Sequence, residues 1–229
     1  MSQEIPMLNP YPWKRPVAWV TWTILASTIA VFLCQLYEAH IRGYDVVGDT
    51  LAFSQQSFTD HRYWTLITYA WVHAVSMFGS SDYFWVHIAT NMIALFCLGP
   101  ALEECLGHWR YLGLYIGGAI AAALFWMLLN SDSDVEGGVV GASGAVFALI
   151  AAAGTIAPRE RVVVYLFYVL PIKMTLRTMA LVICGAELAQ AVFGWLPEIA
   201  HTAHLGGALF GFLYIVAIRF VLRKKPVYG

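Results

Sequence analysis

Charged side chains are scarce in this sequence. Lys, Arg, Asp and Glu make up 12% of its 229 residues, whereas 60% are hydrophobic. A soluble domain carries roughly 25% charged residues. The mean hydropathy of this chain is +0.67. So much apolar surface cannot all be buried in the core of one soluble domain, so we expect the chain to lie in a lipid bilayer. The formal net charge of -1 gives no reason to expect nucleic-acid binding, which depends on basic side chains that neutralise phosphates.

Cysteines and metal-binding motifs are also few. The four cysteines show no CxxC spacing, so the sequence predicts neither a disulfide framework nor a zinc site. There is no HExxH motif, which excludes the common kind of zinc protease. Of the carboxylates, only Glu187 lies inside a predicted membrane span, so two facing catalytic carboxylates are not indicated. We expect no cofactor and no metal.

Long apolar runs are what the sequence does have, and a membrane-spanning helix needs about 20 such residues. The expected fold is an all-α membrane protein, a six-transmembrane-helix bundle with a partly embedded first loop at residues 38–83. Its domain would cover residues 17–222, between cytoplasmic tails at 1–16 and 223–229. The segment from Val162 to Leu170 is too short to span and is predicted to be interfacial or strand-like. The predicted spans are Val17–Tyr37, Phe84–Leu98 (or to Leu106), Tyr111–Leu129, Val139–Ile156, Met174–Phe193 and Thr202–Leu222.

The distribution of basic residues predicts the topology. Of the 13 Lys and Arg residues, only Arg42 and Arg62 fall on the predicted outer side, and such a bias marks the inner side of a membrane. Both termini are therefore expected in the cytoplasm, which agrees with an even number of spans. Because no basic, serine-rich transit segment is present, we expect a bacterial inner (plasma) membrane.

Ser143 is the first candidate for chemistry. It lies between small residues at the start of the fourth span, directly after an acidic loop. A serine hydroxyl is a poor nucleophile until a base is held against it. His204, at the start of the last span, is the best candidate for that base.

His87 and Asn91 lie at the start of the second span, and their i,i+4 spacing puts them on one helix face. The predicted topology places both at a similar depth to Ser143 and His204. Polar groups are costly there, so they should face the bundle interior and contact one another. Taken alone, each of these polar side chains would more often serve only to form a hydrogen bond between helices. Four at one depth favour a catalytic site.

Small residues near both candidates favour close helix packing. Gly144 follows the serine, and Gly207 and Gly211 form a GxxxG pair after the histidine. A hydrogen bond between serine and histidine requires such an approach. GxxxG packing without any chemistry remains an alternative for this feature.

With these residues together, the chain resembles the rhomboid family of intramembrane serine proteases, from roughly Tyr63 to Tyr214. Three motifs carry the resemblance in order, and the run from Gly99 to Leu112 resembles the family's turn between the second and third spans. The motifs are GxSG at Gly141-Ala142-Ser143-Gly144, AHxxGxxxG from Ala203 to Gly211, and HxxxN from His87 to Asn91.

The resemblance implies a Ser–His dyad without a third acid, in which Ser143 is the nucleophile and His204 the general base and later acid. It implies that Asn91, His87 and the Ser143 backbone N–H stabilise the oxyanion, and that Phe147 stacks on the catalytic imidazole. The implied partners are transmembrane helices of other proteins, cut near the outer face of the bilayer.

Several alternatives stay open. His201 is an alternative candidate for the base and is interpreted mainly as an interfacial residue, and His73 is expected to be structural. For Glu187, a functional role and a neutral, hydrogen-bonded or snorkelling side chain are both possible. The rival functions are a catalytically inactive rhomboid-like protein that binds transmembrane clients, and a small transporter or channel. Against the transporter, the polar residues cluster at one face of the membrane instead of tracing a path across it.

Overall fold

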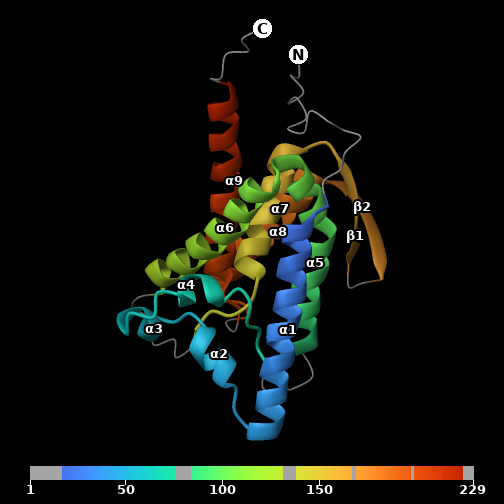
Figure 1. The fold of residues 1–229 in the computed structure, drawn as a ribbon. Coiled ribbons are helices and arrows are strands. Elements are labelled where there is room, and N and C mark those ends of the chain that lie inside the picture. Colours follow the sequence, from blue (N-terminus) through green and yellow to red (C-terminus); the bar gives the residue numbers. More distant parts are fainter. Residues whose placement is uncertain (1–16, 76–83, 131–137, 167–168, 197–198, 224–229) are drawn as a thin grey trace.

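The computed structural model describes residues 17–75, 84–130, 138–166, 169–196 and 199–223 (Figure 1). Five helices in these ranges are long and apolar enough to cross a membrane, and α7 is a shorter apolar helix. The expected helical membrane bundle is therefore confirmed. The two predicted tails, except Arg223, and most of the acidic loop (131–137) lie outside the described residues. The five long helices are α1 (Trp19–Arg42), α5 (Phe84–Leu106), α6 (His108–Leu129), α8 (Leu176–Phe193) and α9 (His201–Arg223), and the shorter α7 runs from Ser143 to Ile156.

Local capping decides where several of these helices begin and end. A left-handed glycine ends two of them: Gly43, with φ 77°, closes α1, and Gly194, with φ 66°, closes α8. Thr175 caps the start of α8, because its hydroxyl accepts a hydrogen bond from the backbone N–H of Thr178 at 3.1 Å. At the start of α1, the buried carboxylate of Glu103 on α5 accepts the N–H groups of Val20 at 3.0 Å and Thr21 at 2.8 Å, and so satisfies donors that a helix leaves free.

The fourth span begins later than predicted, at Ser143 and not at Val139. Val139 pairs with Phe53 of the first loop in an isolated antiparallel bridge, and Gly141 has a φ of 110°, which only glycine adopts readily. The lead-in to α7, residues 139–142, therefore passes from an extended bridge at Val139 into a turn at Gly141 and Ala142.

The first loop forms a compact layer at one end of the bundle, in the lower part of Figure 1. It contains three short helices, α2 (Val46–Leu51), α3 (Gln55–Thr59) and α4 (Thr65–Thr68). Phe53 and Tyr69 from this segment are completely buried. The side chain of Gln35 on α1 anchors the loop at His73. It accepts a hydrogen bond from the His73 N–H at 2.9 Å and donates one to the His73 carbonyl at 3.0 Å.

A two-stranded antiparallel hairpin joins α7 to α8. It consists of β1 (Arg161–Leu166) and β2 (Leu170–Thr175), with a register that runs from Arg161 opposite Thr175 to Leu166 opposite Leu170. The strand-like interpretation of the segment from Val162 is confirmed. The predicted start of the fifth span at Met174 was wrong, because Met174 belongs to β2 and α8 begins at Leu176.

Helix α7 lies inside the bundle and packs against α9, α6, α8 and α5. Most of its side chains are buried. At its far end the guanidinium of Arg219 on α9 donates to the carbonyl of Thr155 at 2.7 Å. The start of α1 and the end of α9 lie at the same end of the bundle in Figure 1, while α5, α7 and α9 all begin nearer the opposite end, where the first loop lies. The site described next is built from the starts of these three helices.

Candidate active site

Ser143 and His204 are in direct contact. Ser143 is the first residue of α7, and His204 lies in the first turn of α9. The Oγ of Ser143 lies 2.8 Å from Nε2 of His204, which is hydrogen-bond distance for a nucleophile and its base. His204 is only 9% exposed. The contact expected from the sequence is therefore present, in a largely buried setting.

Glycines allow α7 and α9 to come this close. A Cβ at Gly207 would lie 2.0 Å from the carbonyl oxygen of Gly144, and one at Gly211 would lie 2.1 Å from the carbonyl oxygen of Ala148. A Cβ at Gly144 itself would lie 2.5 Å from the Cβ of Ala122 on α6. No larger residue fits at these positions unless the helices separate, and separation would break the contact between serine and histidine.

Phe147 holds the plane of the His204 imidazole. Its ring lies parallel to the imidazole, with centroids 4.4 Å apart and an interplanar angle of 6°. Because Phe147 is one turn after Ser143 on α7, the hydroxyl and the stacking ring come from the same helix face. The position agrees with the expectation drawn from the resemblance.

Glu187 on α8 is the functional candidate that the sequence left unassigned. Its Oε2 lies 2.8 Å from Nδ1 of His204, on the side of the ring opposite Ser143. The resemblance implied a dyad without a third acid, and it did not predict this carboxylate contact with Nδ1 of His204. The sequence did offer one sign of its importance, which is its position inside a predicted membrane span. An ionisable residue there is costly and is a functional candidate by default.

His201 shares that carboxylate. Its Nδ1 lies 2.7 Å from the same Oε2 of Glu187, and its Nε2 faces the carbonyl oxygens of Trp195 at 2.9 Å and Leu196 at 3.1 Å. With 6% exposure it is a buried residue at the first position of α9. Both of its nitrogens are engaged away from Ser143, which leaves His204 as the only described histidine bonded to that hydroxyl.

Asn91 and His87 lie on α5, but their contacts are with their surroundings and not with Ser143. The side-chain amide of Asn91 donates to the carbonyl oxygen of His87 at 2.9 Å. The His87 ring lies against the lead-in to α7, because a Cβ at Gly141 would be 2.8 Å from its Nε2. His87 thus packs against Gly141, two residues before the serine, and Asn91 lies one turn further along the same helix.

His73 supports the same lead-in from the first loop. Its Nε2 accepts a hydrogen bond from the backbone N–H of Ala142 at 3.4 Å, and its ring centroid lies 5.1 Å from that of His87. Burial, with a smaller contribution from His87, lowers the pKa of His73 to about 3. A neutral imidazole can accept the Ala142 N–H. This agrees with a structural role next to the serine.

Among the described residues, Glu187, His201 and His204 offer donor atoms within 4.8 Å of one another. Their facing atoms are already joined in the hydrogen bonds given above. The arrangement therefore fits a hydrogen-bonded network.

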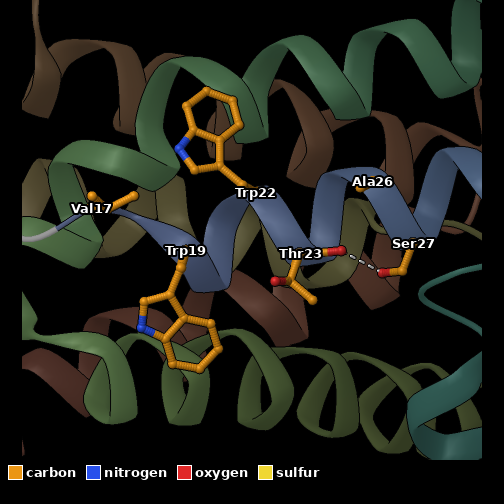
Figure 2. A pocket seen from close by; sticks show the side chains of 6 residues that line it. All are labelled: Val17, Trp19, Trp22, Thr23, Ala26 and Ser27. Carbon is orange, nitrogen blue, oxygen red and sulfur yellow. Dashed lines mark hydrogen bonds between the residues drawn. The ribbon is translucent and has the colours of Figure 1, made fainter.

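A shallow groove runs along α1, away from this site (Figure 2). Its walls include Trp19 and Trp22, which are 45% and 43% exposed, and the Ser27 hydroxyl is turned back onto the carbonyl of Thr23 at 2.7 Å. Exposed aromatic and apolar side chains of this kind suit a lipid-facing helix surface. The groove brings no reactive groups together.

The fold and the site together define a multi-pass membrane protein with a buried serine–imidazole–carboxylate arrangement at one end of its bundle. The family model for the Rhomboid domain matches residues 60–220. This chain belongs to the rhomboid family.

Curated relatives agree with this assignment. The chain is 30% identical to RHOMBOID-like protein 5 of Arabidopsis thaliana, over 96% of this chain and 72% of that protein. It is 31% identical to presenilin-associated rhomboid-like protein A, mitochondrial, of Danio rerio, over 59% of this chain and 34% of that protein. It is 32% identical to Rhomboid protein 1, mitochondrial, of Saccharomyces cerevisiae, over 61% of this chain and 40% of that protein. The chain therefore spans well under half of the two mitochondrial relatives.

Proposed function

We propose that the chain is an intramembrane serine endopeptidase that cleaves transmembrane segments of other membrane proteins. The observation that carries the proposal is the 2.8 Å contact between Ser143 Oγ and His204 Nε2 at the start of a buried helix. Membership of the rhomboid family supports the same reaction. Acyl transfer needs a nucleophile, a base on it and a donor for the oxyanion, and this end of the bundle offers candidates for each.

In the proposed mechanism, Ser143 attacks the scissile carbonyl carbon while His204 takes the hydroxyl proton on Nε2. The negative charge moves to the carbonyl oxygen, where the Ser143 backbone N–H, Asn91 and His87 are the proposed donors. Asn91 would have to turn away from the His87 carbonyl that it now bonds. His204 then gives its proton to the departing amine, and a water molecule, deprotonated by His204, releases the acyl group from Ser143.

The proposed partners are transmembrane helices within the bilayer. The backbone carbonyls of a helix are engaged in hydrogen bonds, so a segment must unwind before its carbonyl can be attacked. Substrates with helix-weakening residues near the cut should therefore be favoured.

We further propose that both termini face the cytoplasm, because all of the 13 Lys and Arg residues except Arg42 and Arg62 fall on the predicted inner side. The bacterial inner membrane expected from the sequence gains no support from the relatives, whose names and organisms are mitochondrial or plant.

The test uses the purified chain in lipid vesicles with a reporter that carries a transmembrane helix. Wild type should cleave the reporter, and Ser143→Ala and His204→Ala should each abolish cleavage. His40→Ala, which removes an exposed imidazole at the end of α1, is the matched control and should cleave normally. Cleavage that persists in Ser143→Ala would refute the mechanism. Reporter binding without cleavage by wild type would favour an inactive, client-binding protein.

A further inference from the structure

A single carboxylate oxygen joins the two histidines at the start of α9. Oε2 of Glu187 lies 2.8 Å from Nδ1 of His204 and 2.7 Å from Nδ1 of His201. The Glu187 side chain is 13% exposed, and those of His201 and His204 are 6% and 11% exposed. Water therefore competes little for these contacts. The three groups form one hydrogen-bonded network. Glu187 on α8 contacts His204 at Nδ1, the ring nitrogen that does not face Ser143.

The partners of each nitrogen indicate where the protons lie. Nε2 of His201 faces two carbonyl oxygens, which can only accept, so this nitrogen carries a proton. With Glu187 as an acceptor-only carboxylate, both Nδ1 atoms carry protons as well. His201 is then a cation that balances the carboxylate charge, as buried charges require. His204 is then neutral, with its free lone pair on Nε2.

That arrangement is the one a general base requires. A proton held on Nδ1 leaves the lone pair of Nε2 directed at Ser143 Oγ, 2.8 Å away. The opposite tautomer would present an N–H to the serine and could not accept its proton. The carboxylate also stabilises the imidazolium that forms once His204 has taken the proton.

We propose that Glu187 is a positioning residue that selects the reactive tautomer of His204, and that His201 holds Glu187 in place as its counter-ion. The inference deepens the proposed protease function and rests on it for its catalytic consequence. It makes the site a Ser–His–Glu arrangement in which the acid comes from α8. His201 acts on the base only through Glu187.

Glu187→Gln tests the inference, because it keeps the size of the side chain and removes its charge. In serine proteases with a carboxylate on the same nitrogen, this kind of change lowers kcat by about 10⁴-fold. We expect kcat for the helical reporter to fall by roughly 10²–10⁴-fold with little change in KM. Glu187→Asp, which keeps the charge, should recover part of the loss. Gln190→Ala, on the same helix and outside the network, is the matched control and should leave kcat unchanged.

Nitrogen NMR of isotope-labelled histidine reads the tautomer without any need for activity. Wild type should show His204 protonated on Nδ1 and His201 protonated on both nitrogens, and Glu187→Gln should lose both signatures while unfolding at a temperature close to that of wild type. An unchanged kcat or an unchanged His204 tautomer in folded Glu187→Gln would overturn the inference. If wild type does not cleave the reporter, the proposed function fails, and the histidine spectrum alone then decides the role of Glu187.

Discussion

The chemistry of this chain depends on which atoms of a few polar side chains face one another inside an apolar bundle. Two of these residues, Ser143 and His204, could be paired from the sequence because each lies in a short motif of small residues. Glu187 could not be paired with His204, because it lies in α8 and the rotation of α8 about its axis is set by packing. No local pattern shows that its carboxylate is turned towards α9 and not towards lipid.

His73 illustrates how burial affects a residue outside the spans. Its pKa is lowered from an ordinary 6.5 to about 3, chiefly by burial, so the folded chain binds this proton less readily than the unfolded chain does. The stability that neutral His73 contributes is fully present above pH 6.5 and is lost as the pH falls towards about 3. We expect the unfolding midpoint to decline across this range in wild type.

The comparison is with His73→Gln, which has no imidazole to titrate. The decline of its unfolding midpoint with falling pH should be shallower than that of wild type, as measured by thermal unfolding in detergent at a series of pH values. Parallel curves for the two proteins would show that His73 does not titrate as described.

At the scale of helices and strands, apolar run length predicted most of the elements, because spanning a bilayer requires a long apolar segment. The boundaries were less predictable where a single residue decides them. The late start of α7 depends on the bridge between Val139 and Phe53, which joins segments far apart in the chain. The start of α8 depends on the pairing of β2 with β1, which a run of apolar residues does not reveal.

The contact between α7 and α9 gives a prediction about helix packing. Gly207→Ala would place a Cβ 2.0 Å from the carbonyl oxygen of Gly144, so the helices must move apart. Overpacking of this kind typically costs about 1–3 kcal/mol. We expect a lower unfolding midpoint and a large loss of reporter cleavage, since the movement separates His204 from Ser143.

Gly185→Ala is the matched control within another helix. A Cβ at Gly185 meets nothing within 4 Å, and alanine is favoured over glycine in a helix by roughly 0.8–1 kcal/mol. This variant should unfold at the same temperature as wild type or slightly higher and keep full cleavage. If Gly207→Ala and Gly185→Ala had the same unfolding temperature and the same cleavage, the idea that Gly207 allows the close approach of α7 and α9 would be contradicted.

At the scale of the whole molecule, charge asymmetry predicts how the bundle sits in its membrane. The first loop lies at one end of the bundle, and the start of α1 and the end of α9 lie at the other. The sequence predicted an even number of crossings from the basic residues alone. It did not predict that the first loop would fold into three short helices packed under the site, because their apolar stretches are too short to stand out.

Thiol labelling tests this orientation. In a chain without its four native cysteines, Asp60→Cys lies in the first loop and Arg159→Cys lies just after α7, and both positions are exposed. An impermeant thiol reagent added outside intact cells should label Asp60→Cys at once and Arg159→Cys only after permeabilisation. The reverse pattern would invert the proposed topology.

The most direct test of the central claim is mass spectrometry of the chain after treatment with a serine-reactive fluorophosphonate. Because His204 should activate only the hydroxyl that it contacts, we predict a single adduct on Ser143 in wild type. Labelling should be lost in His204→Ala and slowed in Glu187→Gln. An adduct on another residue, or undiminished labelling of Ser143 without His204, would contradict the account.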